Sequence, residues 1–398
     1  MVKDMLNFLR AITPSFLLSA YHFLWSFMGA LVYGFPSKNL TVIGVTGTNG
    51  KSTTVDMLSR IFREAGVKTA SLSSIRFQIL DKEWRNKRKM TMPGRFSVQK
   101  FLRDAKKAGC THVILEVTSE GILQHRHRFI HFHGAVLTNL SPEHIERHGS
   151  FENYKKAKGK LFVVAKDLHV INGDDKNAEY FLSFPAKKVV RYSWSEAQNL
   201  NLNLRLLGDF NRMNALAAVK VAESFGIPFD VSKRALEKMS VVPGRMEAVI
   251  KEPIRVVVDY AFTPAALEKV YQALRPAVCV LGAAGGGRDT WKRPVLGGIA
   301  AKYCARVIVT NEDPYNEDPM KIINEVAKGA GDKAEKILDR REAIRKALNL
   351  AHPGDTVVIT GKGSEDSIAQ NGKKIPWDDR EVVKEEFAKI VDKAGNSW

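Results

Sequence analysis

The stretch of sequence from residue 40 to residue 65 constrains the fold more than any other. An apolar run, Leu40–Val45, leads into the loop TGTNGKST, and Ser52–Ala65 then repeats apolar residues at helical spacing. Glycines let backbone N–H groups surround phosphate oxygens, and the dipole of the following helix favours the same negative charge. In such a loop Lys51 contacts the β- and γ-phosphates and Ser52 binds Mg²⁺. The pattern predicts that the ATP-binding residues include Gly47, Thr48, Asn49, Gly50, Lys51, Ser52 and Thr53.

The strict phosphate-loop pattern has a glycine where this chain has Val45, so a glycine turn with a fortuitous Gly-Lys-Ser is the competing interpretation. The strand pattern before the loop and the helix pattern after it favour a phosphate loop.

Strand and helix patterns alternate along the rest of the chain. Apolar, β-branched runs occur at Leu40–Val45, His112–Val117, Ala135–Leu140, Val256–Tyr260, Val278–Leu281, Arg306–Thr310 and Thr356–Thr360. The alternation predicts an α/β fold with mainly parallel sheets, whose ligands bind at the carboxyl ends of the strands. A break is expected near residues 241–244. We predict a hydrophobic N-terminal helix (1–38), a P-loop nucleotide-binding central domain (39–243) and a C-terminal Rossmann-like domain (244–398).

The composition restricts the class of partner. The 398 residues carry a formal net charge of +18, but no basic run is interleaved with aromatic residues, so we expect no nucleic-acid binding. A membrane surface and phosphorylated or carboxylated substrates account better for the charge. The three cysteines are widely spaced, which indicates a reducing compartment and neither a disulfide framework nor a zinc ribbon.

The N-terminal segment carries no Asp, Glu, Lys or Arg from Ala11 to Ser37. As a helix, Phe16–Phe35 would extend about 30 Å, the thickness of a bilayer core. Small-residue cleavage sites typical of a secretory signal peptide are absent from the segment. Two interpretations stay open: residues 11–37 attach a cytoplasmic protein to the inner face of the cell membrane, or they form a hydrophobic docking helix.

Three further residues suggest metal and phosphate chemistry. Glu116 lies near the end of the strand pattern HVILEV, where a carboxylate can face the phosphate loop and bind a hard cation. His144 follows the next strand pattern, and Lys158 comes fourteen residues later. Taken alone, His144 reads as a loop histidine and Lys158 as a solvated helix charge.

A resemblance to a known family changes that assessment. TGTNGKST and NLSPEHIERHGSFENYKKAKGKLF resemble the corresponding stretches of the Mur ligases, and the loop also resembles that of the folylpolyglutamate synthetases. The resemblance implies an ATP- and Mg²⁺-dependent ligase that joins an amino acid to a carboxylate through an acyl phosphate. It implies that Lys51 is catalytic, that Ser52, Glu116 and His144 bind metal, and that Lys158 is carbamoylated and supports the metal site.

The resemblance also suggests an acceptor site. EVTSEGILQHRH resembles a stretch that contacts the muramoyl-peptide through a serine and an arginine, here Ser119 and Arg126, and Thr91 begins a threonine-proline substrate element. The family usually has histidine in place of Glu120, and the element has lost its second threonine. The alternating histidines from His125 to His133 could suggest a metal site, but we interpret them as a strand with one solvated face.

The C-terminal half contains more of the family's motifs in the same order. GDFNRMNALAA, PGRME and VVDYAFTP imply nucleotide contacts by Asn214, Arg245 and Asp259, although Phe262 replaces a histidine. GGGRDTWKRP resembles the MurE-type branch, the UDP-N-acetylmuramoyl-tripeptide synthetases, and implies that an arginine grips the α-carboxylate of the incoming amino acid. The substrate-binding residues implied for this half are Arg288, Glu312, Asp313, Tyr315 and Glu365.

These motifs predict a ligase for peptidoglycan precursors, and thus a role in cell-wall formation, cell shape and division. The branch's N-terminal UDP-binding domain has no counterpart in residues 1–38, so a UDP-linked or a lipid-linked acceptor stays open. A folate-type or capsule-polymer ligase and a non-catalytic membrane-bound scaffold are competing interpretations, although all four predicted catalytic residues are present. Tyr315 stands where diaminopimelate-adding enzymes have arginine, which favours a lysine-like substrate. The sequence does not indicate an oligomeric state.

Overall fold

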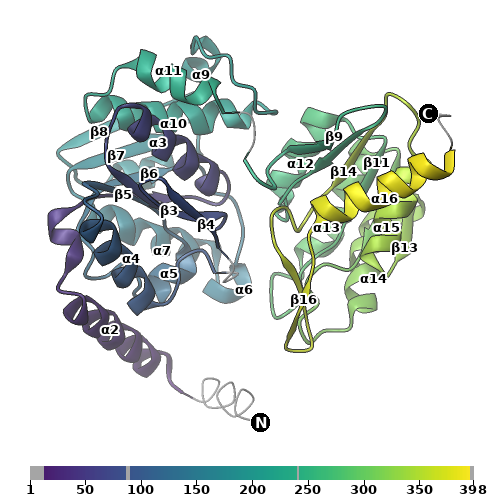
Figure 1. The fold of residues 1–398 in the computed structure, drawn as a ribbon. Helices are drawn as coiled ribbons and strands as arrows, with labels where there is room; N and C mark the ends of the chain where they lie inside the picture. Colours follow the sequence, from purple (N-terminus) through teal and green to yellow (C-terminus); the bar gives the residue numbers. More distant parts are fainter. Residues whose placement is uncertain (1–12, 87–89, 240–241, 395–398) are drawn as a thin grey trace. The chain divides into compact units, whose positions relative to one another are not determined.

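A computed structural model describes residues 13–86, 90–239 and 242–394 of the chain. The fold consists of two compact units (Figure 1). Unit 1 comprises Met1–Leu140, Glu152–Leu202 and Met213–Leu236. Unit 2 comprises Ser141–Phe151, Asn203–Arg212 and Glu237–Trp398.

Unit 1 is built on an eight-stranded sheet in the order β4-β3-β2-β5-β1-β6-β7-β8. Strand β1 lies in the middle, parallel to β5 on one side and to β6 on the other. Only the β2–β3 and β3–β4 pairs among the described strands of this sheet are antiparallel. The strands are β1 Thr41–Thr46, β2 Thr69–Leu72, β3 Arg76–Ile79, β4 Lys82–Arg85, β5 His112–Glu116, β6 Phe132–Leu137, β7 Leu168–Asn172 and β8 Lys188–Tyr192.

Helices cover both faces of this sheet (Figure 1). Helix α3, Lys51–Glu64, buries Val55, Leu58 and Ile61 against the sheet because these residues recur every three or four positions. The other helical elements with residues in unit 1 are α2 Ser15–Val32, η1 Pro36–Asn39, α4 Arg95–Lys107, α5 Ser119–Leu123, α7 Phe151–Val164, α8 Ala178–Leu182, α9 Trp194–Asn199, α10 Phe210–Ser224 and α11 Phe229–Glu237.

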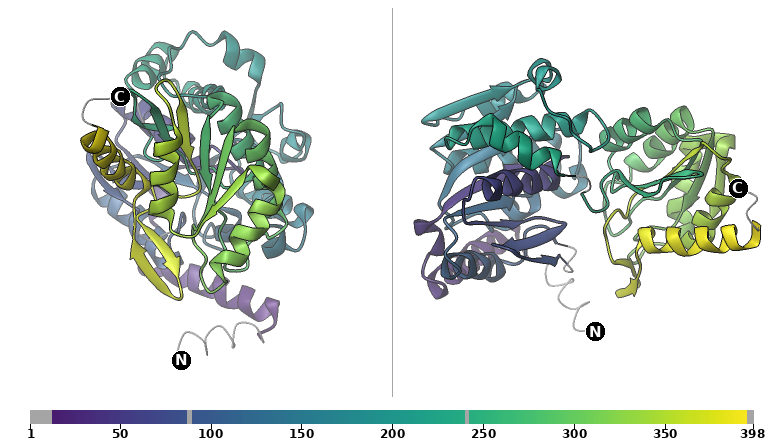
Figure 2. Two further views of the ribbon diagram at one scale, coloured as in Figure 1. Left: turned by 90° about the vertical axis from the view of Figure 1, so that its right-hand side faces the viewer. Right: turned by 45° about the horizontal axis from the view of Figure 1, so that its top comes forward.

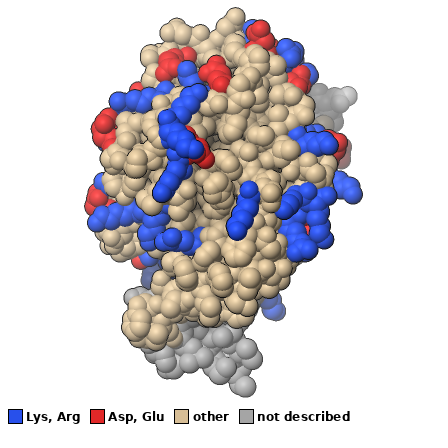
Figure 3. All heavy atoms as spheres, turned by 90° about the vertical axis from the view of Figure 1, so that its left-hand side faces the viewer, with Lys and Arg blue, Asp and Glu red and all other residues tan. Residues whose placement is uncertain are grey.

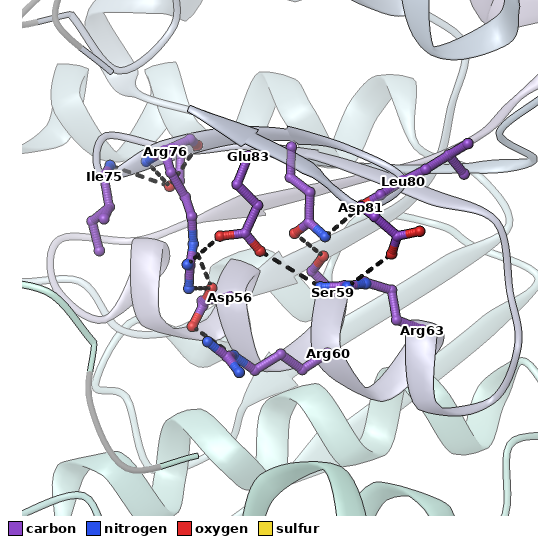
Figure 4. A network of polar contacts seen from close by, with 11 residues as sticks. Asp56, Ser59, Arg60, Arg63, Ile75, Arg76, Leu80, Asp81 and Glu83 are labelled. Carbon is purple, nitrogen blue, oxygen red and sulfur yellow. Dashed lines mark hydrogen bonds and ion pairs between the residues drawn. The ribbon is translucent and has the colours of Figure 1, made fainter. Parts of the chain in front are cut away.

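Polar contacts fasten α3 to the hairpin of β3 and β4 (Figure 4). Arg76 on β3 pairs with Asp56 on α3, and its other guanidinium nitrogen donates to Glu83 at 2.7 Å. Arg63 pairs with Asp81 and Glu83. Because α3 begins at the phosphate loop and the hairpin follows Ser73–Ser74, this network holds both segments in one orientation.

Unit 2 is a second α/β layer structure with a six-stranded sheet in the order β13-β12-β11-β14-β10-β9. Its described pairs are parallel except for β9–β10, and β15 pairs with β16 as a separate hairpin. The strands are β9 Glu247–Ile250, β10 Arg255–Val258, β11 Val278–Leu281, β12 Arg306–Thr310, β13 Ala334–Ile337, β14 Thr356–Ile359, β15 Ser367–Gln370 and β16 Lys373–Pro376.

Two apolar clusters lie on opposite faces of the unit 2 sheet. On β10, Val257 belongs to the cluster with α12, α13 and α14, whereas Val256 and Val258 belong to the cluster with α15 and α16. This two-residue alternation explains why the strand is apolar throughout. Figure 2 shows helices on both faces of the sheet. The helical elements that lie wholly in unit 2 are α6 Ile145–His148, α12 Pro264–Leu274, α13 Lys292–Tyr303, α14 Pro319–Ala330, η2 Gly331–Lys333, α15 Arg340–Leu350 and α16 Asp379–Ala394.

The strand interpretation of the histidine-rich stretch is wrong for most of its length. The chain turns after α5, with His125 and Phe129 at φ values of 56° and 59°. Such left-handed residues break the two-residue alternation of a strand, and β6 begins only at Phe132. The predicted strand Ala135–Leu140 is likewise shifted, since β6 ends at Leu137 and the next residues turn toward the phosphate loop.

The described part of the N-terminal hydrophobic segment contains α2, which packs on α4, and residues 1–12 of the predicted segment lie outside the described residues. Within the part of the chain that the structure describes, no helix is both long and apolar enough to cross a bilayer.

Candidate active site

The phosphate loop of unit 1 joins β1 to α3 at the carboxyl edge of the sheet. Gly47 has a φ of 147° and Gly50 a φ of 82°, values that side-chain-bearing residues rarely adopt. Gly47 also lies so close to Thr138 that an added Cβ would stand 2.0 Å from its Oγ1 atom. Gly50 then N-caps α3, so the first residues of the helix, Lys51, Ser52 and Thr53, face the loop. The loop therefore needs glycine at both positions for geometric reasons.

Thr138 and Asn139, which follow β6, fix the loop's conformation. Thr48 N donates to Asn139 O at 2.8 Å, and Asn49 N donates to Asn139 Oδ1 at 3.0 Å. Thr138 Oγ1 and Asn139 Nδ2 both donate to Asn49 O, at 2.6 and 3.0 Å. The two residues that follow β6 thus hold the loop in a fixed conformation before an anion binds.

Ser52 and Glu116 are hydrogen-bonded to each other beside the loop. Ser52 Oγ donates to Glu116 Oε2 at 2.8 Å, and Ser74 N donates to the same carboxylate oxygen at 2.8 Å. The two serine hydroxyl oxygens lie 2.7 Å apart. Glu116 is the last residue of β5 and is 3% exposed. A hydroxyl and a carboxylate oxygen in contact suit a hard cation such as Mg²⁺.

Lys158, on α7, reaches the loop from another helix. Its Nζ atom donates to Gly47 O at 2.7 Å and stands 4.7 Å from the centre of the Tyr154 ring. Its side chain is 1% exposed, and this burial lowers the pKa of the amine well below its ordinary value. The Lys51 cation lowers that pKa further, whereas Glu116 raises it. Lys158 therefore has a strongly increased neutral fraction.

Lys51 and Asn214 complete the cluster around the loop. Lys51 Nζ donates to Thr48 O at 2.8 Å, so its ammonium group folds back over the loop. A Cβ added to Gly50 would lie 2.3 Å from Asn214 Oδ1. The structure thus brings together Lys51, Ser52, Glu116, Lys158 and Asn214, which are far apart in the sequence.

The two predicted acceptor segments also meet in unit 1. The Arg126 guanidinium donates to Met92 O, next to Thr91, and to Gln124 Oε1 at 2.7 Å. Burial lowers the pKa of Arg126 to about 10. Ser119, buried, begins α5, and a Cβ at Gly121 in that helix would meet the Met92 sulfur at 2.5 Å.

His144 lies in Ser141–Phe151, which belongs to unit 2, so the structure does not test its approach to Glu116. It N-caps α6 with a φ of 57°. Its segment is held to the start of α13, where Lys292 Nζ donates to Glu143 Oε1 at 2.7 Å. No group of three or more His, Cys, Asp and Glu side chains in residues 13–86, 90–239 and 242–394 is arranged to hold a metal ion.

The PGRME and VVDYAFTP motifs lie together in unit 2. Gly244 packs against the 361–365 loop, and a Cβ there would stand 2.0 Å from Ser364 N. The carboxylate of Asp259 accepts hydrogen bonds from Met246 N at 2.7 Å and Ala261 N at 2.6 Å. The guanidinium of Arg245 lies 4.3 Å from the centre of the Tyr260 ring. Asp259 therefore shapes the turn that carries Arg245.

Unit 2 contains a buried acidic cluster at the ends of β12 and β14. Lys362 Nζ donates to Asp313 Oδ1 at 2.9 Å and to Glu365 Oε2 at 2.5 Å. Glu312 is 5% exposed, and its Oε2 atom has no hydrogen-bond partner in the described part of the chain. Burial raises the pKa of Glu312, against the opposing effect of Lys362. The cluster therefore includes a carboxylate oxygen that lacks a donor.

Arg288 and Tyr315 lie next to this cluster. Arg288 Nη2 donates to Tyr315 Oη at 2.9 Å, and the guanidinium stands 5.3 Å from the ring centre. Tyr260 Oη donates to Glu365 Oε1 at 3.2 Å. Glu312, Asp313 and Glu365 therefore lie near the cations Lys362, Arg288 and Arg340, the last of which is paired with Asp379.

Three residues that contact the phosphate loop or its neighbours, Ser74, Thr138 and Asn139, were not predicted from the sequence. Each follows directly or closely after a strand of the parallel sheet, and that position was the available signal.

The comparisons with known proteins agree with this geometry. Residues 45–201 match the Mur ligase middle domain, and residues 244–363 match the Mur ligase glutamate ligase domain. The UDP-N-acetylmuramyl-tripeptide synthetase of Roseiflexus sp. (strain RS-1) is 34% identical over 91% of this chain and 81% of its own length. The UDP-N-acetylmuramoyl-L-alanyl-D-glutamate–2,6-diaminopimelate ligase of Syntrophomonas wolfei subsp. wolfei is 37% identical over 90% of this chain and 80% of its own length.

Solved structures show the same fold. A UDP-N-acetylmuramoyl-L-alanyl-D-glutamate–2,6-diaminopimelate ligase matches with a TM-score of 0.58 at 30% identity, over 88% of this chain and 79% of that one. The Mycobacterium tuberculosis folylpolyglutamate synthase complexed with ADP and AMPPCP matches with a TM-score of 0.70 at 19% identity, over 85% of this chain and 92% of that one. Fold and site define a P-loop ligase that uses ATP. The chain belongs to the Mur ligase family of ATP-dependent amide ligases.

Proposed function

We propose that the protein adds an amino acid to the carboxylate of a muramoyl-peptide, through an acyl phosphate, in peptidoglycan precursor synthesis. The observation that carries the proposal is the gathering of Lys51, Ser52, Glu116 and Lys158 around one preorganised phosphate loop. The names of the relatives support the muramoyl-peptide as acceptor.

The chemistry explains why these side chains belong together. Attack of an acceptor carboxylate on the γ-phosphate brings two anions together, and cations must offset their repulsion. Lys51 supplies one positive charge at the β- and γ-phosphates. Ser52 and Glu116 are the residues that would hold Mg²⁺, which would neutralise phosphate charge and align the oxygens. The carboxylate oxygen bonds to the γ-phosphorus while the bond to ADP breaks, which gives the acyl phosphate and ADP. The neutral amine of the incoming amino acid then attacks the acyl carbon, the amide forms, and phosphate and the amine's proton leave.

Lys158 is proposed to work as a carbamate. An amine must be neutral to react with CO₂, and the burial of Lys158 provides that neutral form. The product is an anion on a buried side chain beside Lys51 and the loop, where a second Mg²⁺ would offset it. We propose His144 as a further ligand of that second ion.

Nucleotide and acceptor contacts are assigned by the same logic. Asn214, Arg245 and Asp259 are proposed to contribute to the nucleotide site. Thr91, Ser119 and Arg126 are proposed for the acceptor site, because the hydrogen bond from Arg126 to Met92 O joins its two segments. A ligation assay that offers both substrates distinguishes a UDP-linked from a lipid-linked acceptor. We propose residues 39–243 as the central ATP-binding domain and residues 244–398 as the C-terminal Rossmann-like domain. We also propose that the enzyme acts in the cytoplasm.

The acidic cluster of unit 2 is proposed to select the amino acid. Arg288 would bind the α-carboxylate, while Glu312, Asp313 and Glu365 would attract a distal ammonium group. Two cations that could replace the missing arginine at Tyr315 are already paired: Lys362 with Asp313 and Glu365, and Arg293 with two other glutamates. The Oε2 atom of Glu312 accepts no hydrogen bond from the described residues, and a distal ammonium group of the substrate would supply the missing donor. We therefore propose lysine, or another diamine-bearing amino acid, over diaminopimelate.

The test is a ligation assay with purified protein, ATP and Mg²⁺. UDP-linked and lipid-linked muramoyl-dipeptides are offered in parallel with a panel of amino acids, and products are identified by mass. We expect amide product together with ADP and phosphate in equal amounts, and none from Lys51→Ala. ATP hydrolysis without amide product for every acceptor and amino acid would contradict the proposal.

A further inference from the structure

One side of helix α2 is buried against the rest of unit 1. Ser26, Gly29 and Ala30 are buried, and Leu18 and His22 are half-buried one and two turns earlier. These positions recur every three or four residues, so they share one side of the helix.

The buried side of α2 contacts α4. His22 contacts Arg95 on α4, and Gly29 allows close approach to the α4 backbone at Arg95 and Phe96. The helix is therefore docked firmly along one side.

The opposite side of α2 is apolar and exposed. Leu17, Leu24 and Leu31 follow one another at helical spacing and are 48%, 57% and 50% exposed. The flanks are apolar as well, with Phe16 at 69% and Val32 at 54%. Singly exposed apolar residues are normal on proteins, but a contiguous apolar face indicates a binding surface.

Aromatic side chains border this face where it meets the rest of unit 1. Tyr21 and Trp25 pack edge to face, and Trp25 lies 5.7 Å from Phe96 on α4. Phe23 and Phe27 pack on Phe129, at 5.1 and 5.4 Å between ring centres. Aromatic residues in this position are typical of proteins whose apolar side enters the interfacial region of a bilayer.

Cationic side chains surround the apolar face. Lys38 Nζ lies 5.2 Å from the centre of the Phe35 ring, which packs on Phe27 of α2. Arg95 lies over the Tyr21 ring, and exposed Arg128 adjoins Phe129. Helix α4, on which α2 packs, adds three exposed lysines: Lys106, Lys107 and Lys100, the last of which is paired with Asp104. Figure 3 shows an uncharged region at the lower part of this face, where α2 lies, and Lys and Arg side chains above it.

We propose that α2 and its cationic border form a docking surface for an anionic lipid bilayer. The helix lies in the plane of the interface, its outer leucines enter the acyl region, and the lysines and arginines contact lipid phosphates. An apolar face together with a basic border provides the two signals that stable membrane attachment requires. This inference is independent of the ligase reaction.

Charge favours a bilayer over a second copy of this chain as the occupant. Two copies meeting through α2 would bring two identical basic borders together, with no Asp or Glu in Ala11–Ser37 to offset them. An anionic bilayer offers the complementary charge. A helix held along one side by α4, with no spanning helix among the described residues, fits an orientation along the surface.

The experiment measures flotation of the full-length protein with vesicles. Vesicles of phosphatidylcholine with a third phosphatidylglycerol are compared with pure phosphatidylcholine, at low and high salt. We expect binding to the anionic vesicles that falls as salt rises, and weak binding to the neutral ones. Leu24→Glu combined with Leu31→Glu should lower the partition coefficient at least about tenfold. Lys38→Gln and Lys100→Gln should each lower it about fivefold.

Control variants carry the same kinds of substitution at positions outside the proposed docking surface. Val163→Glu with Val189→Glu alters two equally exposed apolar residues elsewhere in unit 1, and Lys384→Gln removes a lysine from unit 2. All controls should bind as the wild type does. Equal binding by the Leu24/Leu31 variant would overturn the proposal. So would a wild type that stays unbound and elutes as a dimer that the same two substitutions convert to a monomer.

Discussion

The Nζ atom of Lys158 donates a hydrogen bond of 2.7 Å to the carbonyl oxygen of Gly47, the first glycine of the TGTNGKST loop. A lysine from α7 therefore contacts the backbone that is proposed to surround the phosphates. Burial and the neighbouring Lys51 lower the pKa of this amine, which favours its neutral form. An ordinary phosphate-binding lysine would keep its charge, and this contrast leads to the first prediction.

Lys158→Ala should be nearly inactive, because it removes the carbamate proposed to support the second metal ion. Short-chain carboxylic acids should restore part of the activity, since a carboxylate can occupy the vacated space. The measurement is kcat with and without added acetate or propionate.

A surface lysine provides the comparison for Lys158. Lys160→Ala, two residues further along α7 on the exposed side, should keep wild-type kcat and show no response to the acids. Full activity of Lys158→Ala without any added acid would contradict the carbamate.

Carbamate formation also predicts dependence on CO₂. Enzyme freed of bicarbonate at low pH should lose activity, because protonation of Lys158 releases CO₂. Activity should return when bicarbonate is added at higher pH, where the amine is neutral. Because its pKa is lowered, recovery should occur at a pH below the ordinary range of a lysine. An activity that is indifferent to bicarbonate removal at every pH would argue against the modification.

The phosphate loop should not tolerate a side chain at Gly47. Gly47→Ala would place a methyl group against Thr138 Oγ1 and the Asn139 carbonyl, in a backbone conformation that disfavours alanine. We expect a loss of at least about 1–3 kcal/mol of local stability and a more than tenfold weaker ATP affinity, measured by calorimetry.

Gly66→Ala is the matched control for Gly47→Ala. Gly66 follows α3, has a φ of 75°, and has open space around the added Cβ. It should lose about 1–2 kcal/mol from backbone strain alone and bind ATP normally. Unchanged ATP affinity of Gly47→Ala would show that the loop adapts and that its contacts with Thr138 are dispensable.

The phosphate-loop segment could be predicted from the sequence because its chemistry is local. Lys51 and Ser52 adjoin the glycines that need their φ values, and helix α3 follows at once. Glu116 was singled out because it ends an apolar run, and its carboxylate accepts a hydrogen bond from Ser52. In each case a few consecutive residues carried the signal.

The supporting contacts could not be predicted because they depend on strand order. Ser74, Thr138 and Asn139 reach the loop only because β2, β5, β1 and β6 are neighbours in that order. A single sequence does not specify that order, and hydroxyl or amide residues after strands are common. The strand prediction for the histidine-rich stretch was wrong for a related reason. Two left-handed residues, His125 and Phe129, change the chain direction within an alternating pattern.

Substrate choice is the last prediction, and it rests on charge in unit 2. Lys362 and Arg293 are each held by two carboxylates, so neither offers a free cation to a distal carboxylate. Glu312 Oε2, by contrast, is buried without a donor in the described residues. Lysine should therefore have the highest kcat/KM in a panel with ornithine and diaminopimelate. A charge-assisted hydrogen bond of about 1.5–3 kcal/mol corresponds to roughly a tenfold to hundredfold preference.

Two substitutions separate this hypothesis from a general effect on the site. Glu312→Gln should lower kcat/KM for lysine about tenfold or more, mainly through KM, because the amide keeps the shape but not the charge. Tyr315→Arg should shift preference toward diaminopimelate by supplying the missing cation. Glu335→Gln, half-exposed on β13, is the inert acidic control. A wild-type preference for diaminopimelate would refute the charge argument, because the substrate's distal carboxylate would then be bound without the arginine that Tyr315 replaces.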